Sequence, residues 1–178
     1  MLPKGHVVFK GLTFLAWAIF VGLCVDAGGL IVNCIVSVYS PESVQYLYQK
    51  LDLTEVYSHN KLTFIIIYTF ILAIAYLKLY LFYIVIKLLS KLDLQNPFNI
   101  QVSKQILLIS YLTFAIGIGS YSAKQIVQMI SNYEQTVQAL DQFWVDSQAF
   151  IMMAAVIYVV ATIFNHGVQL QNENDLTV

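Results

Sequence analysis

Four long apolar segments run along the chain, and shorter polar stretches separate them. They cover residues of about 7–38, 62–89, 104–123 and 145–165. A helix that crosses a bilayer needs roughly 17–25 mostly apolar residues, so the first three segments are long enough and the fourth is marginal. The pattern therefore predicts an all-α fold, a single integral membrane domain over 1–178 that forms a four-helix bundle.

The two longer connections, residues 40–61 and 124–144, are predicted to be amphipathic helical segments on the outer side. In the first, Pro41 and Glu42 mark a helix start. In the second, apolar side chains fall within about 60° of one line and continue the third span: Met129, Ile130, Tyr133, Val137, Leu140 and Trp144. Two interpretations stay open, because such helices either pack together as a cap or lie flat in the membrane interface.

Composition narrows the class of protein. Hydrophobic residues make up 59% of the chain and charged residues only 11%, whereas an ordinary soluble domain has about 25% charged residues. This balance argues against a soluble enzyme, a disordered chain and direct binding of nucleic acid. The nine basic residues are all lysines, so the bidentate grip of arginine on phosphate is missing.

Lysine placement predicts the orientation. Five lysines lie before the first span or around the connection between the second and third spans, and three lie on the other side: Lys4, Lys10, Lys87, Lys91 and Lys104 against Lys50, Lys61 and Lys124. Because cytoplasmic connections carry an excess of basic residues, we expect both termini in the cytoplasm.

Asp26 and Lys78 are ionisable residues inside predicted spans. Such groups cost roughly 2.5–3.5 kcal/mol each at mid-membrane and indicate a functional site by default. Counting from the inner edge at about 1.5 Å per residue puts them roughly 9 Å apart in depth. Three interpretations stay open: a structural pair between the spans, separate roles for each residue, or a transport site. Asn33 is the third polar candidate inside the membrane.

Small and polar residues form a stripe on two of the predicted spans. The first span has Gly11, Leu15, Ala18, Gly22, Asp26, Gly29, Asn33 and Ser37, and the third has Ser110, Thr113, Gly117 and Ser120. Small residues let helices approach closely in lipid, so we expect both stripes to be packing faces. The alternative for the first stripe is a polar groove or ion path.

The sequence contains no catalytic constellation. His6, His59 and His166 lack Cys or His neighbours at metal-ligand spacing. Cys24 and Cys34 are ten residues apart on one predicted helix, which is about 15 Å and too far for a disulfide. We therefore expect no enzymatic activity, no cofactor and no metal.

Two short motifs stand out on the predicted cytoplasmic side. The first is the turn Asn96-Pro97-Phe98, after which Asn99 is placed to cap the third span. The second is the polar tail 166–178, where Gly167 is expected to end the fourth helix. The tail closes with Glu173, Asp175, Leu176, Thr177 and Val178.

With these motifs the chain resembles an uncharacterised family of small bacterial four-span membrane proteins, classed as a domain of unknown function. The resemblance rests on Asn96, Pro97 and Phe98 and on a C-terminal pattern of Gly167, Leu170, Gln171, Glu173, Asp175, Leu176, Thr177 and Val178. It implies a bacterial cytoplasmic (inner) membrane and a neighbouring helix-turn-helix regulator as a protein partner. The chain departs from the family in carrying only Lys104 as a basic residue after the turn.

Two functional hypotheses follow. The first is a non-enzymatic interaction, sensing or regulatory protein that works through the tail, which either folds back under the bundle or is read by a partner as a linear motif. The second is a protein that binds or transports a small solute, an ion or a lipid with Asp26, Asn33 and Lys78. The lipid bilayer is the expected surrounding in both, and the oligomeric state stays open.

Overall fold

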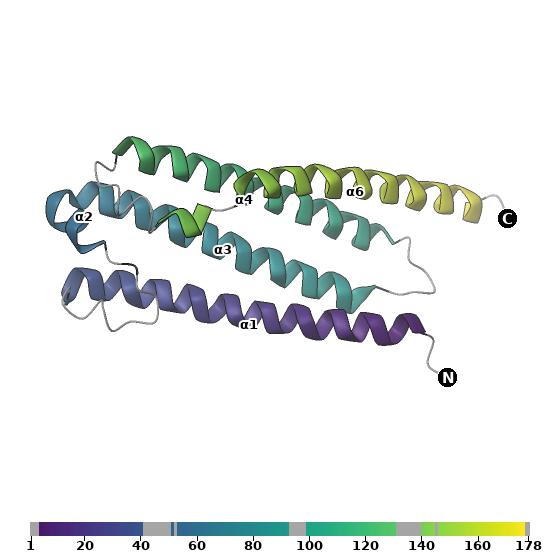
Figure 1. The fold of residues 1–178 in the computed structure, drawn as a ribbon. Helices are drawn as coiled ribbons and strands as arrows, with labels where there is room; N and C mark the ends of the chain where they lie inside the picture. The colour runs from purple at the N-terminus through teal and green to yellow at the C-terminus, as the bar shows by residue number, and fades with distance from the viewer. Residues whose placement is uncertain are drawn as a thin grey trace.

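The computed structural model describes residues 4–40, 51, 53–92, 99–130, 140–144 and 146–176. Within these ranges the chain is helical and has no strand. The elements are α1 (Lys4–Tyr39), α2 (Thr54–His59), α3 (Lys61–Lys91), α4 (Ile100–Ile130) and α6 (Ser147–Leu176). Residues 140–144 form a further helical turn. Both termini lie at one end of the bundle, the terminal end, and α2 lies at the other, the distal end (Figure 1).

The long helices pack side by side in a row. α3 packs between α1 and α4, and α4 packs between α3 and α6 (Figure 1). Among the described residues, four segments are long and apolar enough to cross a membrane: Val8–Tyr39, Lys61–Lys91, Ile100–Met129 and Leu140–Glu173. The predicted all-α four-helix membrane bundle is thereby confirmed.

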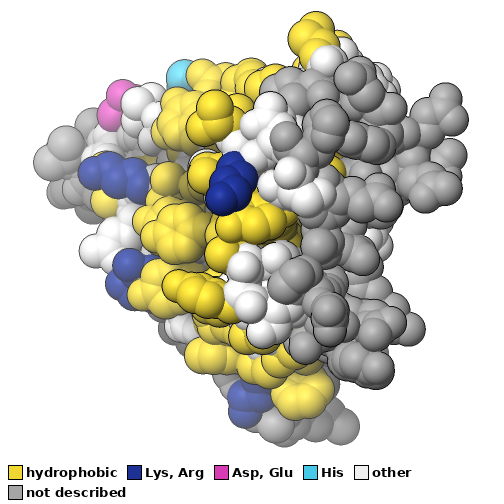
Figure 2. Space-filling model, turned by 90° about the vertical axis from the view of Figure 1, so that its left-hand side faces the viewer, with side chains coloured by type: hydrophobic (Ala, Val, Ile, Leu, Met, Phe, Trp, Pro, Cys, Tyr) yellow, Lys and Arg dark blue, Asp and Glu magenta, His cyan; other side chains and the backbone are white. Residues whose placement is uncertain are grey.

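Seen from the distal end, the described surface is mainly hydrophobic (Figure 2). Lysine side chains are visible there, but they lie apart from one another rather than in a cluster. Among the described residues, Lys124 forms an ion pair with Asp141, with 3.2 Å between its Nζ and the carboxylate oxygen. The two side chains are partly exposed, so their attraction adds at most about 1 kcal/mol.

Asparagine side chains begin two of the helices. At the start of α3, Asn60 Oδ1 accepts hydrogen bonds from the backbone N–H groups of Leu62 and Thr63. At the start of α4, Asn99 Oδ1 accepts from the N–H of Gln101 at 2.8 Å. Because the first N–H groups of a helix have no partner within the helix, these bonds define where each helix begins. The predicted cap at Asn99 is confirmed.

The packing face of α4 is the predicted stripe of small residues. Ser110, Thr113 and Ser120 are buried, and the Ser110 hydroxyl donates to the carbonyl of Ala154 at 3.0 Å. A Cβ built on Gly117 would lie 2.7 Å from the Ile151 side chain and 3.1 Å from the Ser147 carbonyl oxygen. The close approach of α4 and α6 therefore requires glycine at this position.

This contact also fixes where α6 begins. Ser147, its first residue, lies against Gly117 near the middle of α4, so α6 covers only the half of α4 toward the terminal end. Ser103 and Asn165 share a hydrogen bond of 3.3 Å, which places the first residue of α4 about level with Val168 of α6. The remaining eight residues, 169–176, extend about 12 Å past α4 (Figure 1). We call them the C-terminal arm.

The predicted helix end at Gly167 is wrong, because α6 continues through this residue to Leu176. Glycine inside a helix costs only about 1 kcal/mol relative to alanine, and no proline follows to block the next turn. The next residue, Val168, is buried, so packing holds the helix together beyond the glycine. Residues 166–176 of the predicted tail are therefore helical.

The described parts of the two connections pack into the bundle. Leu51, Leu53 and Val56 join Leu140 in one buried core cluster with side chains of α3. These residues are therefore buried in the bundle, and the choice between a cap and helices in the membrane interface stays a prediction. The helix start expected at Pro41 and Glu42, and the stretch 131–139 of the second connection, lie outside the described residues.

The predicted packing stripe of α1 is correct only at its distal end. Asn33 and Ser37 are buried, but a Cβ on Gly11 or Gly22 would have no atom within 4 Å. α1 packs on α3 through a face rotated by one residue from the predicted stripe, with Ala16 and Leu30 buried and Leu23 and Ala27 half-buried. The two faces are adjacent on the helix, so helical periodicity in the sequence does not show which of them packs on α3.

We expect Gly117→Ala to destabilise the bundle, because its methyl group must displace Ile151 or the start of α6. Overpacking of this kind costs about 1–3 kcal/mol. Gly119→Ala is the matched control, since its Cβ would meet Ile74 at an ordinary 3.8 Å. Thermal unfolding in detergent measures both, and a Gly117→Ala variant as stable as Gly119→Ala would contradict the close contact.

Candidate functional site

Asn33 joins α1 to α3 through hydrogen bonds. Its Oδ1 accepts from the Tyr68 hydroxyl of α3 and from the Ser37 hydroxyl at 3.3 Å. All three residues are buried. A polar group in an apolar interior must be hydrogen-bonded to be tolerated, and here the bonds also set the register of the two helices. Asn33 is therefore part of the interface between α1 and α3.

In this register, the difference in depth between Asp26 and Lys78 is smaller than the difference estimated from the sequence. Because Asn33 lies level with Tyr68 in antiparallel helices, Asp26 lies level with Ala75. Three residues separate Ala75 from Lys78, which corresponds to about 4.5 Å along the axis. That is half of the difference expected from the sequence.

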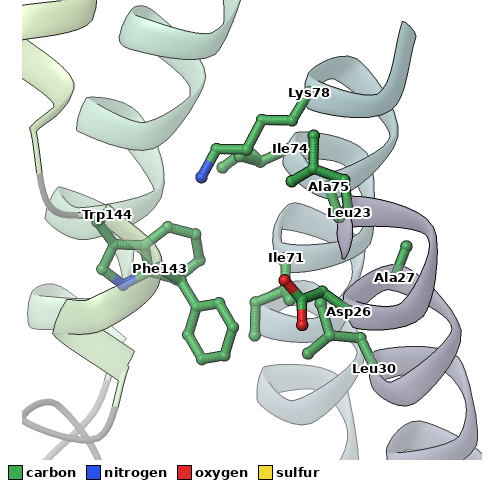
Figure 3. Close-up of a pocket in the computed structure, with 10 residues that line it drawn as sticks. All are labelled: Leu23, Asp26, Ala27, Leu30, Ile71, Ile74, Ala75, Lys78, Phe143 and Trp144. Carbon is green, nitrogen blue, oxygen red and sulfur yellow. The ribbon is translucent and has the colours of Figure 1, made fainter. Parts of the chain in front are cut away.

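Asp26 and Lys78 line one hollow between α1, α3 and the helical turn 140–144, which we call the polar pocket. Its volume is about 130 Å³, and it is lined by Leu23, Asp26, Ala27, Leu30, Ile71, Ile74, Ala75, Lys78, Phe143 and Trp144. In Figure 3 the Lys78 ammonium and the Asp26 carboxylate extend from their helices toward the side where Phe143 and Trp144 lie. The pocket thus carries two opposite charges and an aromatic wall.

Lys78 is oriented toward the start of α6 rather than toward Asp26. Its Nζ lies 6.0 Å from the centroid of the Phe150 ring, and the carboxylate of Asp146 attracts it. Asp146 precedes α6 with a φ of 70°, and its carbonyl accepts from the N–H of Phe150 at 2.9 Å. The first turn of α6 therefore supplies both groups that attract the lysine.

Asp26 and Lys78 do not form an ion pair. Of the described residues, Lys124 and Asp141 form such a pair, and no bond or ion pair reaches Asp26. Asp26 is exposed at the pocket, and Lys78 is half-buried. The interpretation of Asp26 and Lys78 as a structural ion pair between the spans is therefore not supported. Each charged group lines the polar pocket without contacting the other.

Sequence reasoning missed four residues of this region: Phe143, Trp144, Asp146 and Phe150. Trp144 is only 2% exposed, and its indole nitrogen has no hydrogen-bond partner within the described structure. The signal was the Phe143-Trp144 pair just before a short span, with Asp146 and Phe150 at helical spacing after it. Sequence reasoning predicts only Trp144 on the amphipathic outer segment and Phe150 inside the fourth span, because the return of the connection toward the bundle centre depends on distant residues.

The candidate partner-contact residues that the structure describes lie on the C-terminal arm. Glu173 is exposed on the C-terminal arm, and Asp175 and Leu176 are in its last turn. Asn96, Pro97, Phe98, Thr177 and Val178 lie outside the described residues. Leu170, a residue of the C-terminal pattern, is an exposed apolar side chain on the same arm, with 62% of its surface accessible.

Two further observations bear on ligands. Within the described part of the chain, no three His, Cys, Asp or Glu side chains gather in a way that would hold a metal ion. A second hollow of about 390 Å³ lies between α4 and α6 and has a nearly uncharged, apolar lining that includes Tyr111, Phe114 and Tyr158. Its position on the outer surface of two membrane-spanning helices is typical of a surface that lipid chains cover.

The bundle and its long apolar helices define a multi-pass membrane protein. Comparison with known families adds one finding: the family model described as "Protein of unknown function (DUF2975)" matches residues 45–178. The chain belongs to this family, so the predicted membership of an uncharacterised family is confirmed. No curated protein and no solved structure matches the chain. The matched residues include Lys78, Phe143 and the arm, whereas Asp26 and Asn33 on α1 precede them.

We expect the hydrogen bond between Tyr68 and Asn33 to stabilise the packing of α1 on α3. Removing it with Tyr68→Phe, Asn33→Leu and the double variant gives a coupling energy, which is about 0.6–1.7 kcal/mol for buried bonds in membrane bundles. Tyr76→Phe is the control on the same helix, because Tyr76 is exposed. A coupling energy of zero in the thermal unfolding cycle would contradict an architectural role.

Proposed function

We propose that the protein is a non-enzymatic membrane protein of the bacterial cytoplasmic (inner) membrane that acts as an interaction, sensing or regulatory partner through its C-terminal arm. The observation that carries this proposal is the extension of α6 past the other helices at the terminal end. A helix that leaves the bundle in this way offers a face to a partner, as amphipathic helices do when they bind a groove.

The orientation in this proposal places the arm in the cytoplasm. Lys10, Lys87, Lys91 and Lys104 are exposed near the terminal end, and an excess of lysine favours the cytoplasmic side. The distal end has lysines as well, among them Lys124, which pairs with Asp141, but the sequence places fewer lysines on that side. The partner that we propose is a cytoplasmic helix-turn-helix regulator, as the family resemblance implies.

The chemistry of the arm supports a protein partner. Leu170 is an exposed apolar side chain beyond the membrane-spanning part of α6, and Glu173, Asp175, Leu176, Thr177 and Val178 follow it. The Asn96-Pro97-Phe98 turn precedes α4, which begins at the same end of the bundle. Without arginine in the chain, recognition must use these apolar and acidic groups.

Deleting Asp175–Val178, or the single change Leu170→Ser, is expected to weaken binding of the purified regulator about tenfold or more. Burial of a leucine side chain is worth about 1.5–3 kcal/mol, and about 1.4 kcal/mol corresponds to tenfold in affinity. The measurement is a titration with the full chain in nanodiscs. Asn172→Ala is the control for Leu170→Ser, because Asn172 is exposed and lies about 200° around the helix from Leu170. Unchanged affinity in both test variants would refute the proposal.

A second candidate function is the binding or transport of a small solute, an ion or a lipid at the polar pocket. The observation that favours it is the presence of Asp26 and Lys78 in one hollow without an ion pair between them. Isolated charges of this kind are expensive in a membrane unless they face water or a ligand. Asn33 takes no part in this candidate, because it does not line the pocket.

If the pocket admits water, a cysteine that lines it will react with a charged thiol reagent. We expect Ala75→Cys to react about tenfold or more faster than Ala73→Cys, because only a hydrated thiol forms the reactive thiolate. Ala75 lines the pocket, and Ala73 lies two residues away on the exposed face of α3. Both variants need Cys24→Ser and Cys34→Ser. Equally slow reaction at both positions would exclude this candidate.

A further inference from the structure

The polar pocket has a negative and a positive end held apart by the fold. The carboxylate belongs to α1 and the ammonium group to α3, and the register set by Asn33 and Tyr68 offsets their helix positions by three residues. Phe150 and Asp146 attract the ammonium group toward α6. The two charges face the same pocket, and they do not form an ion pair with each other.

The aromatic wall determines which cation suits the negative end. Phe143 lines the same pocket as Asp26 (Figure 3), and the centroid of its ring is 6.3 Å from that of Trp144. Aromatic faces attract ammonium groups that lie within about 6 Å. Calcium or magnesium would instead require several oxygen ligands, whereas Asp26 is the one carboxylate that lines the pocket within the described structure. The negative end suits an organic ammonium group.

The size and position of the pocket limit the rest of the ligand. A volume of about 130 Å³ is close to that of an engineered cavity, about 150 Å³, which binds benzene. A ligand group of about six to eight heavy atoms therefore fits. The pocket lies between α1, α3 and the helical turn 140–144, so a ligand in it contacts three segments of the chain.

We propose that the polar pocket binds a zwitterion whose ammonium group pairs with Asp26 and whose anionic group pairs with Lys78. This inference rests on the second candidate function. The same chemistry is present in the headgroup of an aminophospholipid, which would come from the bilayer, and in a free amino acid or phosphoethanolamine, which would come from water.

The experiment uses the full chain in nanodiscs of phosphatidylglycerol, a lipid without an ammonium group. Phosphatidylethanolamine in the disc and glycine or phosphoethanolamine in solution are the probes, and thermal unfolding is measured. A ligand at 100 times its Kd raises the unfolding temperature by about 5–10 °C in a chain of this length. A shift from the lipid alone assigns the bilayer as the source, and a shift from a dissolved probe alone assigns water.

Charge variants locate the site. Asp26→Asn and Lys78→Met are each expected to weaken binding about tenfold or more, because each removes one of two charge-assisted contacts. Asp141→Asn and Lys87→Met make the same changes outside the pocket and are expected to leave binding unchanged. If either test variant fails to fold, the conservative variants Asp26→Glu and Lys78→Arg, which keep each charge in its place, are expected to fold and to bind.

The outcomes separate this inference from the function on which it rests. No shift from any of the three zwitterions, or a shift that Asp26→Asn does not reduce, overturns the inference. Equal shifts from ethylamine or acetate, each with a single charge, also overturn it, although a solute then still occupies the pocket. A dry pocket in the cysteine experiment overturns the second candidate function itself.

Discussion

The missing side chain at Gly117 is the constraint on which the arrangement of the whole bundle depends. It lets the backbone of α6 come within contact distance of α4, at a point where Ser147 and Ile151 lie against the glycine. The Ser110 and Ser103 hydrogen bonds fix the two helices along the rest of their contact. α6 therefore begins near the middle of α4 and not at its distal end.

Both candidate sites follow from this offset. At the distal side, the chain must return from the end of α4 to its middle before α6 begins, and residues 140–144 fill the space that α6 leaves open. Phe143 and Trp144 thus border the polar pocket. At the terminal side, the same offset carries the last eight residues of α6 beyond the bundle. The pocket and the arm are two consequences of one register.

Features that depend on residues close together in the sequence were predicted correctly. Hydropathy located the spans, and Asn99 and the small residues of α4 were assigned correctly, because capping and helix-face periodicity are local properties. The polar pocket was not foreseen, although Asp26 and Lys78 were singled out. Its shape depends on register between helices, which the contacts at Gly117 and Asn33 set across 30 or more residues of sequence. The prediction of a helix end at Gly167 was wrong, because the packing of Val168 outweighs the local preference of glycine for ending a helix.

The two charges in the pocket are not equally compensated. Lys78 gains from Asp146 and from the Phe150 ring, and a cation over an aromatic ring is stabilised by about 0.5–2 kcal/mol. Asp26 receives no hydrogen bond or ion pair from the described residues, while a charge in this setting costs roughly 2.5–3.5 kcal/mol. Lys78, however, is half-buried and loses hydration, so both charges stay incompletely compensated. The proposed zwitterion would give each charge a partner of opposite sign, which is why the loss of either Asp26 or Lys78 is expected to weaken binding.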